Sequence, residues 1–426
     1  MEGGKKHLKI VHDLPVLYFS SDVKNVSGAD FSEIAKMDCD AGPIIGETGI
    51  DGLRLDFNAG LRLRVPKGEW RIRITDFDSE CLFFDQLISE KVLISMEKYY
   101  VRWQIEAYLD GEMRFAHIFD IEGQDVLFSL AGTLLGDAVM LFPYMRAFVK
   151  EHACNGLFLS SAAFDPIIRE YFSEFQIVDH ITETTYARYS IGAFHTPPFL
   201  LPDSARVLPA NYIGRFLLGL HNTPEKVLYY PLKPRTIEEP YVCIGVQASG
   251  VAKAWWYPGG WEIIVGYLKE LGYRVLCIDR DKKNEDSKGH SVVMPEGVED
   301  FTGNRPLMER IELLAYAEFF VGLASGLSWL ADAAGCPVVL ISGITMPHSE
   351  IDTPYRVLNP LVCHGCYNDV SVNWIDPFCP KHHDMKREYE CSAKISPRMV
   401  VDAIDRLRVD LGAEKNHCKQ ADNSNA

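Results

Sequence analysis

The feature that most constrains the fold is a strand–turn–helix–strand pattern that occurs in two separate stretches of the chain. In the first stretch, an apolar strand at 125–130 is followed by a small-residue turn, a helical pattern at 139–152 and a strand at 156–161. After residue 240, four apolar strands alternate with helical patterns up to residue 343. Alternating strands and helices build parallel sheets. The sequence therefore predicts two doubly wound α/β lobes with a ligand in the cleft between them.

The region before the first lobe has the shorter period of antiparallel strands. Apolar and polar residues alternate at 61–65 and 70–77, and turn residues separate these segments from further short strands up to residue 121. Alternation of this kind is typical of hairpins with one solvated face. We expect a β-barrel or sandwich at 1–122, which acts in assembly or acceptor capture. Lobes at 123–235 and 240–357 follow, joined by a polar, proline-bearing linker at 222–240.

Charge and hydropathy exclude two classes of partner. The chain has 426 residues and a net charge of −16, from 43 Lys and Arg against 59 Asp and Glu. A field of this sign argues against nucleic-acid or anionic-membrane binding. There is no run of 18 apolar residues, and the N-terminus lacks the pattern of an export signal. We therefore expect a cytoplasmic protein without a membrane span.

Four of the eleven cysteines are clustered. They have the spacing Cys363-x2-Cys366-x12-Cys379-x11-Cys391, whereas the other seven are scattered, as in proteins of a reducing compartment. In that setting the cluster predicts a four-cysteine metal finger at 358–392, followed by a helix and a disordered tail at 393–426. Sulfur ligands suit iron or zinc, and a closed shell of four is structural. Three nearby histidines could substitute for a ligand, although surface positions are expected for them: His364, His382 and His383.

The first candidate for chemistry is the turn that follows the strand at 125–130. It reads Gly132-Thr133-Leu134-Leu135-Gly136-Asp137. Glycines at the carboxyl end of a parallel strand let the backbone approach a ligand, and Asp137 lies at the start of the next helix. An aspartate there is also a common helix cap, and the residue pattern alone leaves both roles open.

Two further candidates follow strands of the second lobe. Gln247 and Ser249 lie at the end of the strand at 241–249 and Lys253 follows it, where a lysine suits phosphate oxygens, although a solvated loop lysine is equally compatible. The segment Ser325-Gly326-Leu327-Ser328 begins a helix directly after a strand, so that free N–H groups can hold an anion, with the Ser325 and Ser328 hydroxyls as further donors. The alternative to anion binding is an ordinary capped helix, in which the glycine allows close packing. Arg280, Thr302 and Gly303 lie in other loops at the same edge, where ordinary loops are as compatible.

These residues, taken together, resemble the GT-B glycosyltransferases, specifically the lipopolysaccharide-type heptosyltransferases. The matching residues are Gly136-Asp137, Lys253 and the helix start at Ser325. The chain departs from that family at Ala324 and Trp329, where an aspartate and a histidine are usual. With the N-terminal β-region and the four cysteines, nearly the whole chain is similar to the bacterial autotransporter heptosyltransferases. The resemblance implies an α/β fold with two Rossmann-like lobes, an antiparallel β-barrel or sandwich before them, and an iron finger.

The resemblance also implies a reaction. It is an inverting transfer of heptose from ADP-heptose to serine hydroxyls of autotransporter adhesins, in large ring-shaped homo-oligomers. Asp137 would be the general base and Lys253 would contact the diphosphate, without a catalytic metal. Substrate contacts would come from Thr133, Leu134, Leu135, Gly136, Gln247, Ser249, Arg280, Thr302, Gly303, Ser325, Gly326 and Leu327. Two alternatives remain: a GT-B enzyme that uses another nucleotide sugar, and a non-enzymatic metalloprotein in which the four-cysteine site carries electrons or binds a partner.

Overall fold

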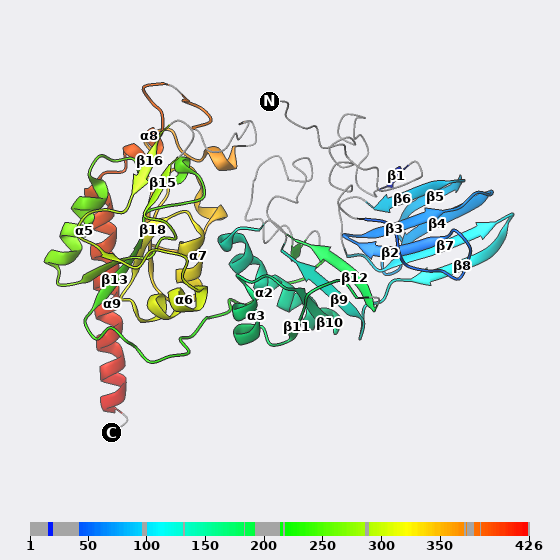
Figure 1. The fold of residues 1–426 in the computed structure, drawn as a ribbon, viewed down its shortest axis with the longest axis horizontal. Coiled ribbons are helices and arrows are strands. Elements are labelled where there is room, and N and C mark those ends of the chain that lie inside the picture. The colour runs from blue at the N-terminus through cyan, green and yellow to red at the C-terminus, as the bar shows by residue number, and fades with distance from the viewer. Residues whose placement is uncertain are drawn as a thin grey trace.

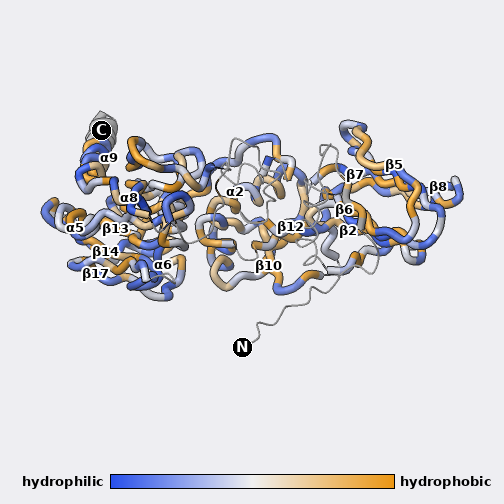
Figure 2. The backbone as a smooth tube through the Cα atoms, turned by 90° about the horizontal axis from the view of Figure 1, so that it is seen from above, coloured by the Kyte–Doolittle hydropathy of each residue, from blue (hydrophilic) through white to orange (hydrophobic). Residues whose placement is uncertain are grey.

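The molecule is elongated and has three parts in a row, with the second α/β lobe at one end, the first in the middle and a β-sandwich at the other end (Figures 1 and 2). The computed structural model describes residues 16–19, 42–95, 100–130, 133–182, 184–191, 214–215, 218–285, 289–369, 372, 379–383 and 385–424. The start of the chain, Gly132 and parts of the cysteine finger lie outside these residues.

The second lobe is a six-stranded parallel sheet covered by helices on both faces (Figure 1). Its strand order is β17-β14-β13-β18-β19-β20, which is the doubly wound order 3-2-1-4-5-6. The strands are β13 (Tyr241–Gly245), β14 (Arg274–Cys277), β17 (Glu299–Asp300), β18 (Phe320–Leu323), β19 (Val338–Ile341) and β20 (Arg356–Val357). The connections include α5 (Gly260–Glu270), α6 (Leu307–Tyr316), α7 (Gly326–Ala333) and the hairpin β15 (Lys283–Glu285) with β16 (Ser291–Val293).

The first lobe repeats this arrangement in shorter form. Its parallel strands have the order β11-β10-β9-β12, and α2 and α3 connect them. The elements are β9 (Asp125–Ser129), α2 (Leu135–His152), β10 (Asn155–Leu159), α3 (Asp165–Tyr171), β11 (Phe175–Val178) and β12 (Thr185–Ser190). The two predicted doubly wound lobes are therefore confirmed.

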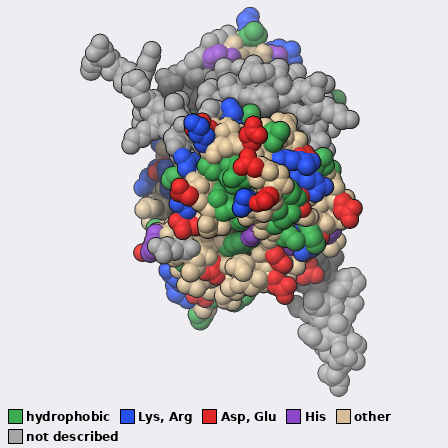
Figure 3. Space-filling model, turned by 90° about the vertical axis from the view of Figure 1, so that its right-hand side faces the viewer, with side chains coloured by type: hydrophobic (Ala, Val, Ile, Leu, Met, Phe, Trp, Pro, Cys, Tyr) green, Lys and Arg blue, Asp and Glu red, His purple; other side chains and the backbone are tan. Residues whose placement is uncertain are grey.

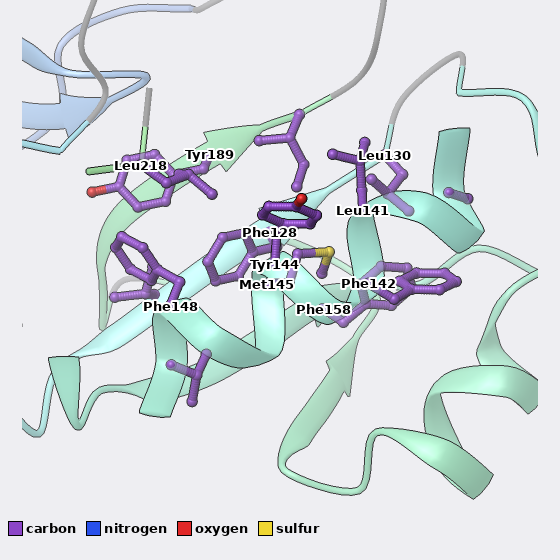
Figure 4. Packing of buried hydrophobic residues seen from close by; sticks show 14 of the residues in the cluster. Phe128, Leu130, Leu141, Phe142, Tyr144, Met145, Phe148, Phe158, Tyr189 and Leu218 are labelled. Carbon is purple, nitrogen blue, oxygen red and sulfur yellow. The ribbon is translucent and has the colours of Figure 1, made fainter. Parts of the chain in front are cut away.

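The core of the first lobe forms where α2 packs on the sheet. The buried face of α2 carries Leu141, Phe142, Met145 and Phe148, which lie against Phe128 of β9 and its neighbours (Figure 4). Aromatic rings meet edge to face in this layer, an arrangement that adds to the burial of apolar area. The packing fixes α2, and it thereby fixes the position of the helix start that faces the second lobe.

The N-terminal region is a sandwich of two sheets. One is the antiparallel sheet β5-β4-β7-β8, and the other contains β1, β6, β3 and β2. The strands are β1 (Val16–Phe19), β2 (Arg54–Asn58), β3 (Leu61–Val65), β4 (Trp70–Asp76), β5 (Leu82–Ile88), β6 (Lys91–Ser95), β7 (Trp103–Leu109) and β8 (Glu112–Ile118). Residues of both sheets share one buried cluster, which includes Leu63, Ile72 and Ile105.

One sheet of the sandwich continues into the first lobe, across the boundary predicted at residue 122. Strand β2 pairs in parallel with β12, so one sheet of eight strands runs through both parts. A buried ion-pair network supports this junction, because Asp56 of β2 accepts hydrogen bonds from Arg62 of β3 and Arg188 of β12. Long-range pairing of this kind leaves no signal in local periodicity.

The outer face of the four-stranded sheet is solvated. In β4, Trp70, Ile72 and Ile74 point inward, whereas Arg71 and Arg73 point outward to carboxylates of the neighbouring strands. Figure 3 views this end of the molecule and shows Lys, Arg, Asp and Glu side chains interspersed with hydrophobic ones. The alternation in the sequence therefore predicted which face of β4 is buried.

The last helix, α9 (Pro397–Ser424), packs its first turns on α5 and the sheet edge through Val400, Ile404 and Leu407. The helix continues past residue 411, where we expected a disordered tail. The segment after 412 contains helix formers such as Ala, Glu, Lys and Gln and no Gly or Pro, so nothing in it ends the helix. Among the described residues, no helix has both the length and the hydropathy that crossing a bilayer requires.

Candidate active site and metal centre

A cavity of about 1140 Å³ lies between the two lobes. It is bordered by the loops that follow the carboxyl ends of β9, β13 and β18, which is where doubly wound sheets bind their ligands. In the second lobe, β13 and β18 are neighbours at the point where the strand order reverses. Most of the predicted site residues line the cavity: Thr133, Leu134, Leu135, Gly136, Asp137, Gln247, Ser249, Lys253, Arg280, Ser325, Gly326 and Leu327.

Two helix starts meet in this cavity, one from each lobe. The first residues of α2 and α7 approach so closely that a Cβ on Gly136 would lie 3.3 Å from Gly326 Cα. Both helices direct their free N–H groups and the positive ends of their dipoles to this point. The cleft therefore has the field that an anion such as a diphosphate needs, even though the chain as a whole is acidic.

Replacing Gly326 by alanine tests this contact. The added methyl would lie 2.9 Å from Leu135 Cβ and 3.0 Å from the backbone N of Gly136, so the two helix starts must separate. We expect a loss of about 1–3 kcal/mol in the free energy of unfolding, together with weaker nucleotide binding. The control is Gly266→Ala in α5, where a Cβ meets nothing within 4 Å. Equal melting temperatures and nucleotide affinities for the two variants would contradict the prediction.

Asp137 lies in the first turn of α2 and is not its N-cap residue. Leu134 occupies the N-cap position, and Asp137 lies half-buried at the cavity wall. Burial raises the pKa of Asp137, while the nearby Lys253 ammonium and the Leu134 backbone favour the charged form. A carboxylate with a raised pKa in a cleft is suited to accept a proton.

The opposite wall carries groups that lack protein partners. Lys253 ends the short 3-10 helix η3 (Val251–Lys253), and its charge acts on Asp137 across the cleft. Ser325 Oγ and Gln247 Nε2 are buried and have no hydrogen-bond partner among the described residues, although both residues line the cavity. Buried polar atoms are normally paired, so these two are available to a ligand.

Three of the expected contacts are not in the cavity wall. Thr302 is buried and bonds to Asp300, and Gly303 donates its N–H to the Arg280 carbonyl, so both belong to the internal structure of their loop. The adjoining Asn304 and Arg305 line the cavity instead. Ser328 is also wrong as a ligand donor, because its hydroxyl is fully buried and bonds to the Leu323 carbonyl at 2.5 Å.

Two acidic residues of the cavity escaped the sequence analysis as functional groups. Asp279 is buried and accepts the backbone N–H groups of Val246 and Gln247, and burial raises its pKa to about 6. These bonds hold the segment that directly follows β13 and contains Gln247. Glu350 lies in the loop after β19 and faces the cavity. Glu350 could have been found from the sequence, because it lies in the loop after the carboxyl end of β19. That strand was predicted, and such loops border the ligand cleft in doubly wound sheets.

The four clustered cysteines come together around a second, small cavity of about 10 Å³. Cys366, Cys379 and Cys391 are buried and Cys363 is half-buried, and burial together with the neighbouring thiols raises the pKa of Cys366 and of Cys391 to about 12. Four thiols fit a metal ion that is bound by sulfur. The positive charge of such an ion would lower the pKa values of these thiols and favour their thiolate forms.

A second donor set overlaps the cysteines. One ligand atom each from Cys363, His382 and Glu390 lies within 4.8 Å of the others. Glu390 is already engaged, since it pairs with Arg387 and accepts the backbone N–H of Cys363. His382 lines the small cavity and is half-buried, whereas we expected a surface residue. The Glu390 carboxylate is therefore less available to a metal ion than the four thiols are.

The cysteine cluster packs directly against two loops of the large cavity. Gly365 and Tyr367 donate backbone hydrogen bonds to the carbonyls of Gly343 and Ile344 in the loop after β19. Trp256, three residues after Lys253, stacks on Tyr389 with ring centroids 5.3 Å apart. The cluster is therefore continuous with the wall of the cleft, and its loss would disturb that wall.

Two facing doubly wound lobes with a ligand cleft between them define a GT-B glycosyltransferase. Residues 49–111 match the model for the N-terminal domain of glycosyltransferase TibC, and residues 220–366 match glycosyltransferase family 9 (heptosyltransferase). The chain is 38% identical over 375 residues to the autotransporter heptosyltransferase BAHTCr of Citrobacter rodentium, which covers 85% of this chain and 91% of that protein. The chain belongs to the autotransporter heptosyltransferase family.

Two further comparisons bear on activity. The crystal structure of TibC from enterotoxigenic Escherichia coli is a dodecameric, iron-containing heptosyltransferase in complex with ADP-D-beta-D-heptose. The present structure matches that of TibC with a TM-score of 0.78 and 35% sequence identity, and the match covers 86% of this chain and 98% of the TibC chain. BimC of Burkholderia thailandensis, 32% identical over 84% of this chain and 86% of that protein, is named an inactive autotransporter heptosyltransferase.

Proposed function

We propose that this protein transfers heptose from ADP-heptose to serine hydroxyls of autotransporter adhesins. The carrying observation is that Asp137 and Lys253 act on each other across a cavity where two helix starts converge. Family membership alone does not establish turnover, because BimC is named inactive. A proton acceptor, a cation and an anion-binding helix end are the groups that a direct displacement at an anomeric carbon requires.

Asp137 is the general base of this proposal. The acceptor serine attacks the anomeric carbon while its proton passes to the Asp137 carboxylate, and the bond from that carbon to the diphosphate breaks. Nothing covalent forms with the protein, so the configuration at the anomeric carbon inverts. Base catalysis of this kind contributes about 10²- to 10⁴-fold to the rate.

Lys253 and the start of α7 stabilise the departing ADP. The diphosphate gains negative charge as the bond breaks, and the N–H groups at Gly326 and the Lys253 ammonium are already oriented toward it. Ser325 Oγ, which has no protein partner, is a further donor. Preorganised donors act without the reorganisation that water would need, and this explains how the leaving group departs without a divalent cation.

We propose the metal ion and the quaternary structure from the similarity to TibC and from the chemistry of the cysteine thiols. Cys363, Cys366, Cys379 and Cys391 would hold one structural iron ion, for which zinc is the alternative, and the ion would crosslink the finger. The proposed quaternary structure is a large ring of identical chains. The reaction is placed in the cytoplasm, where an adhesin can be modified before its export. The domain boundaries predicted from the sequence remain part of this proposal.

Mass spectrometry tests the function directly. An autotransporter adhesin is co-expressed with this protein and digested, and we expect a heptose-sized mass increment on serine-containing peptides. A hexose-sized increment would replace the donor by another nucleotide sugar. No increment, with the protein folded and expressed, would contradict the enzymatic assignment and place this chain with the inactive relative.

Substitution of Lys253 by alanine tests the diphosphate contact. We expect ADP affinity to fall by about 10-fold or more and turnover to fall further, because the lost charge acts more strongly on the developing anion than on the bound ground state. The matched control is Lys282→Ala, a charge removal outside the cavity, since Lys282 pairs with Asp300. Unchanged ADP affinity and turnover in Lys253→Ala would refute the contact.

The pH profile of kcat/KM follows the state of Asp137. Because burial raises its pKa, we expect activity to be lost on acidification at a pH above the ordinary aspartate value of about 3.9. Lys253 favours the charged carboxylate, so Lys253→Ala should move this acidic limb to higher pH. An acidic limb that stays in place in the variant would show that another group titrates.

A further inference from the structure

Glu350 is a further carboxylate in the active-site cavity, and the proposed mechanism gives it no task. It lies in the loop after β19 and is half-buried, with its side chain in the wall of the large cavity. Removing a carboxylate from water costs free energy unless the carboxylate has partners. An acidic residue in a cavity wall is therefore expected to interact with a ligand or with neighbouring groups.

The loop holds Glu350 in a fixed position. The short helix η4 (Pro347–Ser349) precedes it directly, and the Glu350 N–H bonds to the Pro347 carbonyl. Asn368 Oδ1 accepts the Met346 N–H at 2.8 Å and the Ser349 hydroxyl at 3.2 Å. A second restraint lies just upstream of η4, where Ser342 and Thr345 share a hydroxyl hydrogen bond of 2.6 Å. The side chain therefore projects from a preorganised segment.

The charges around Glu350 show which part of a ligand it faces. Burial raises the pKa of Glu350; Lys253, the Thr345 hydroxyl and Arg356 offset part of this rise by favouring the charged form, and Asp137 adds to it. Lys253 thus acts on two of the cavity carboxylates, Glu350 and Asp137. The space that these three residues border lies where the base, the leaving group and the transferred sugar must meet.

Elimination assigns Glu350 to the sugar. A diphosphate is repelled by a carboxylate and has its own site at the start of α7. The acceptor proton is taken by Asp137. Two uncharged portions of a nucleotide sugar carry neighbouring hydroxyl donors, the ribose and the transferred sugar, and two oxygens of one carboxylate can accept hydrogen bonds from such hydroxyls. The transferred sugar is the portion next to the base Asp137, whose charge acts on Glu350.

We propose that Glu350 binds hydroxyl groups of the transferred sugar and so selects and orients the donor. This assignment rests on the proposed function, because it takes a nucleotide sugar as the ligand. Hydrogen bonds to a charged group in a water-poor site discriminate strongly, since an unmatched carboxylate remains buried and unpaired.

The test compares two affinities in each variant, for ADP-heptose and for ADP alone, by calorimetry. We expect Glu350→Ala to lose about 10- to 100-fold in ADP-heptose affinity while ADP affinity changes by less than about threefold. Glu350→Gln keeps the shape and one acceptor oxygen, so its loss should be smaller. Asp352→Ala is the matched control, because Asp352 is exposed on the same loop and outside the cavity wall.

The outcomes separate this inference from the donor assignment. If ADP and ADP-heptose affinities fall together in Glu350→Ala, the residue serves Lys253 and the diphosphate site, and the inference is wrong. Unchanged affinities would overturn it as well. If the wild-type protein binds ADP-heptose no better than ADP, the donor in the proposed function is wrong, and Glu350 is then judged by the same ratio with whichever nucleotide sugar does bind.

Discussion

Asp137→Asn should reduce heptose transfer by about 10²- to 10⁴-fold and leave donor binding almost unchanged. The amide has the size of the carboxylate and cannot accept the acceptor proton at neutral pH. Donor affinity should even rise slightly, because a negative charge near the diphosphate site is removed. The measurements are turnover on a purified acceptor fragment and ADP-heptose affinity by calorimetry.

The control for this variant is Asp281→Asn, which removes a carboxylate from the rim of the same cavity. Asp281 is exposed and pairs with Arg280, so its charge is screened by solvent and its loss should change turnover little. Near-normal turnover in Asp137→Asn would remove the base assignment. A parallel loss of donor affinity would instead show that Asp137 builds the binding site.

Cys366→Ala should release the bound metal and strongly destabilise the finger. The Cys366 side chain is buried against the other three cysteines, and loss of a structural metal belongs to the few mechanisms that cost more than about 4 kcal/mol. Metal content by elemental analysis and the melting temperature are the readouts. Cys336→Ala is the matched control, because Cys336 is equally buried but lies away from the cluster.

The same variant should also weaken ADP binding, although no cysteine of the cluster lines the large cavity. The finger supports the loop after β19 through Gly365 and Tyr367, and it supports the segment after Lys253 through Tyr389 and Trp256. Without the finger, both walls lose their fixed positions. A variant that lacks metal yet melts like Cys336→Ala and binds ADP normally would show that the finger is independent of the active site.

The predicted positions of the site residues rest on local signals. Apolar strands followed by Gly-containing turns placed Asp137, Lys253 and Ser325 at carboxyl strand ends, and parallel topology then required them to share one edge. Thr302, Gly303 and Ser328 were placed at the same edge for the same reason. They failed because an edge position does not fix the direction of a side chain, and each of these residues bonds within its own loop or strand end.

What the sequence alone determined is the set of elements: two doubly wound lobes, the buried face of β4, and a cluster of four cysteines. Periods of 2 and 3.6 residues encode which face of an element is buried, and that information is local. Only the tertiary structure decided that β2 joins β12, that Gly136 and Gly326 bring two helix starts together, and that Glu350 faces Lys253. These contacts join residues far apart in the chain, where packing between elements, which no local pattern records, sets the geometry.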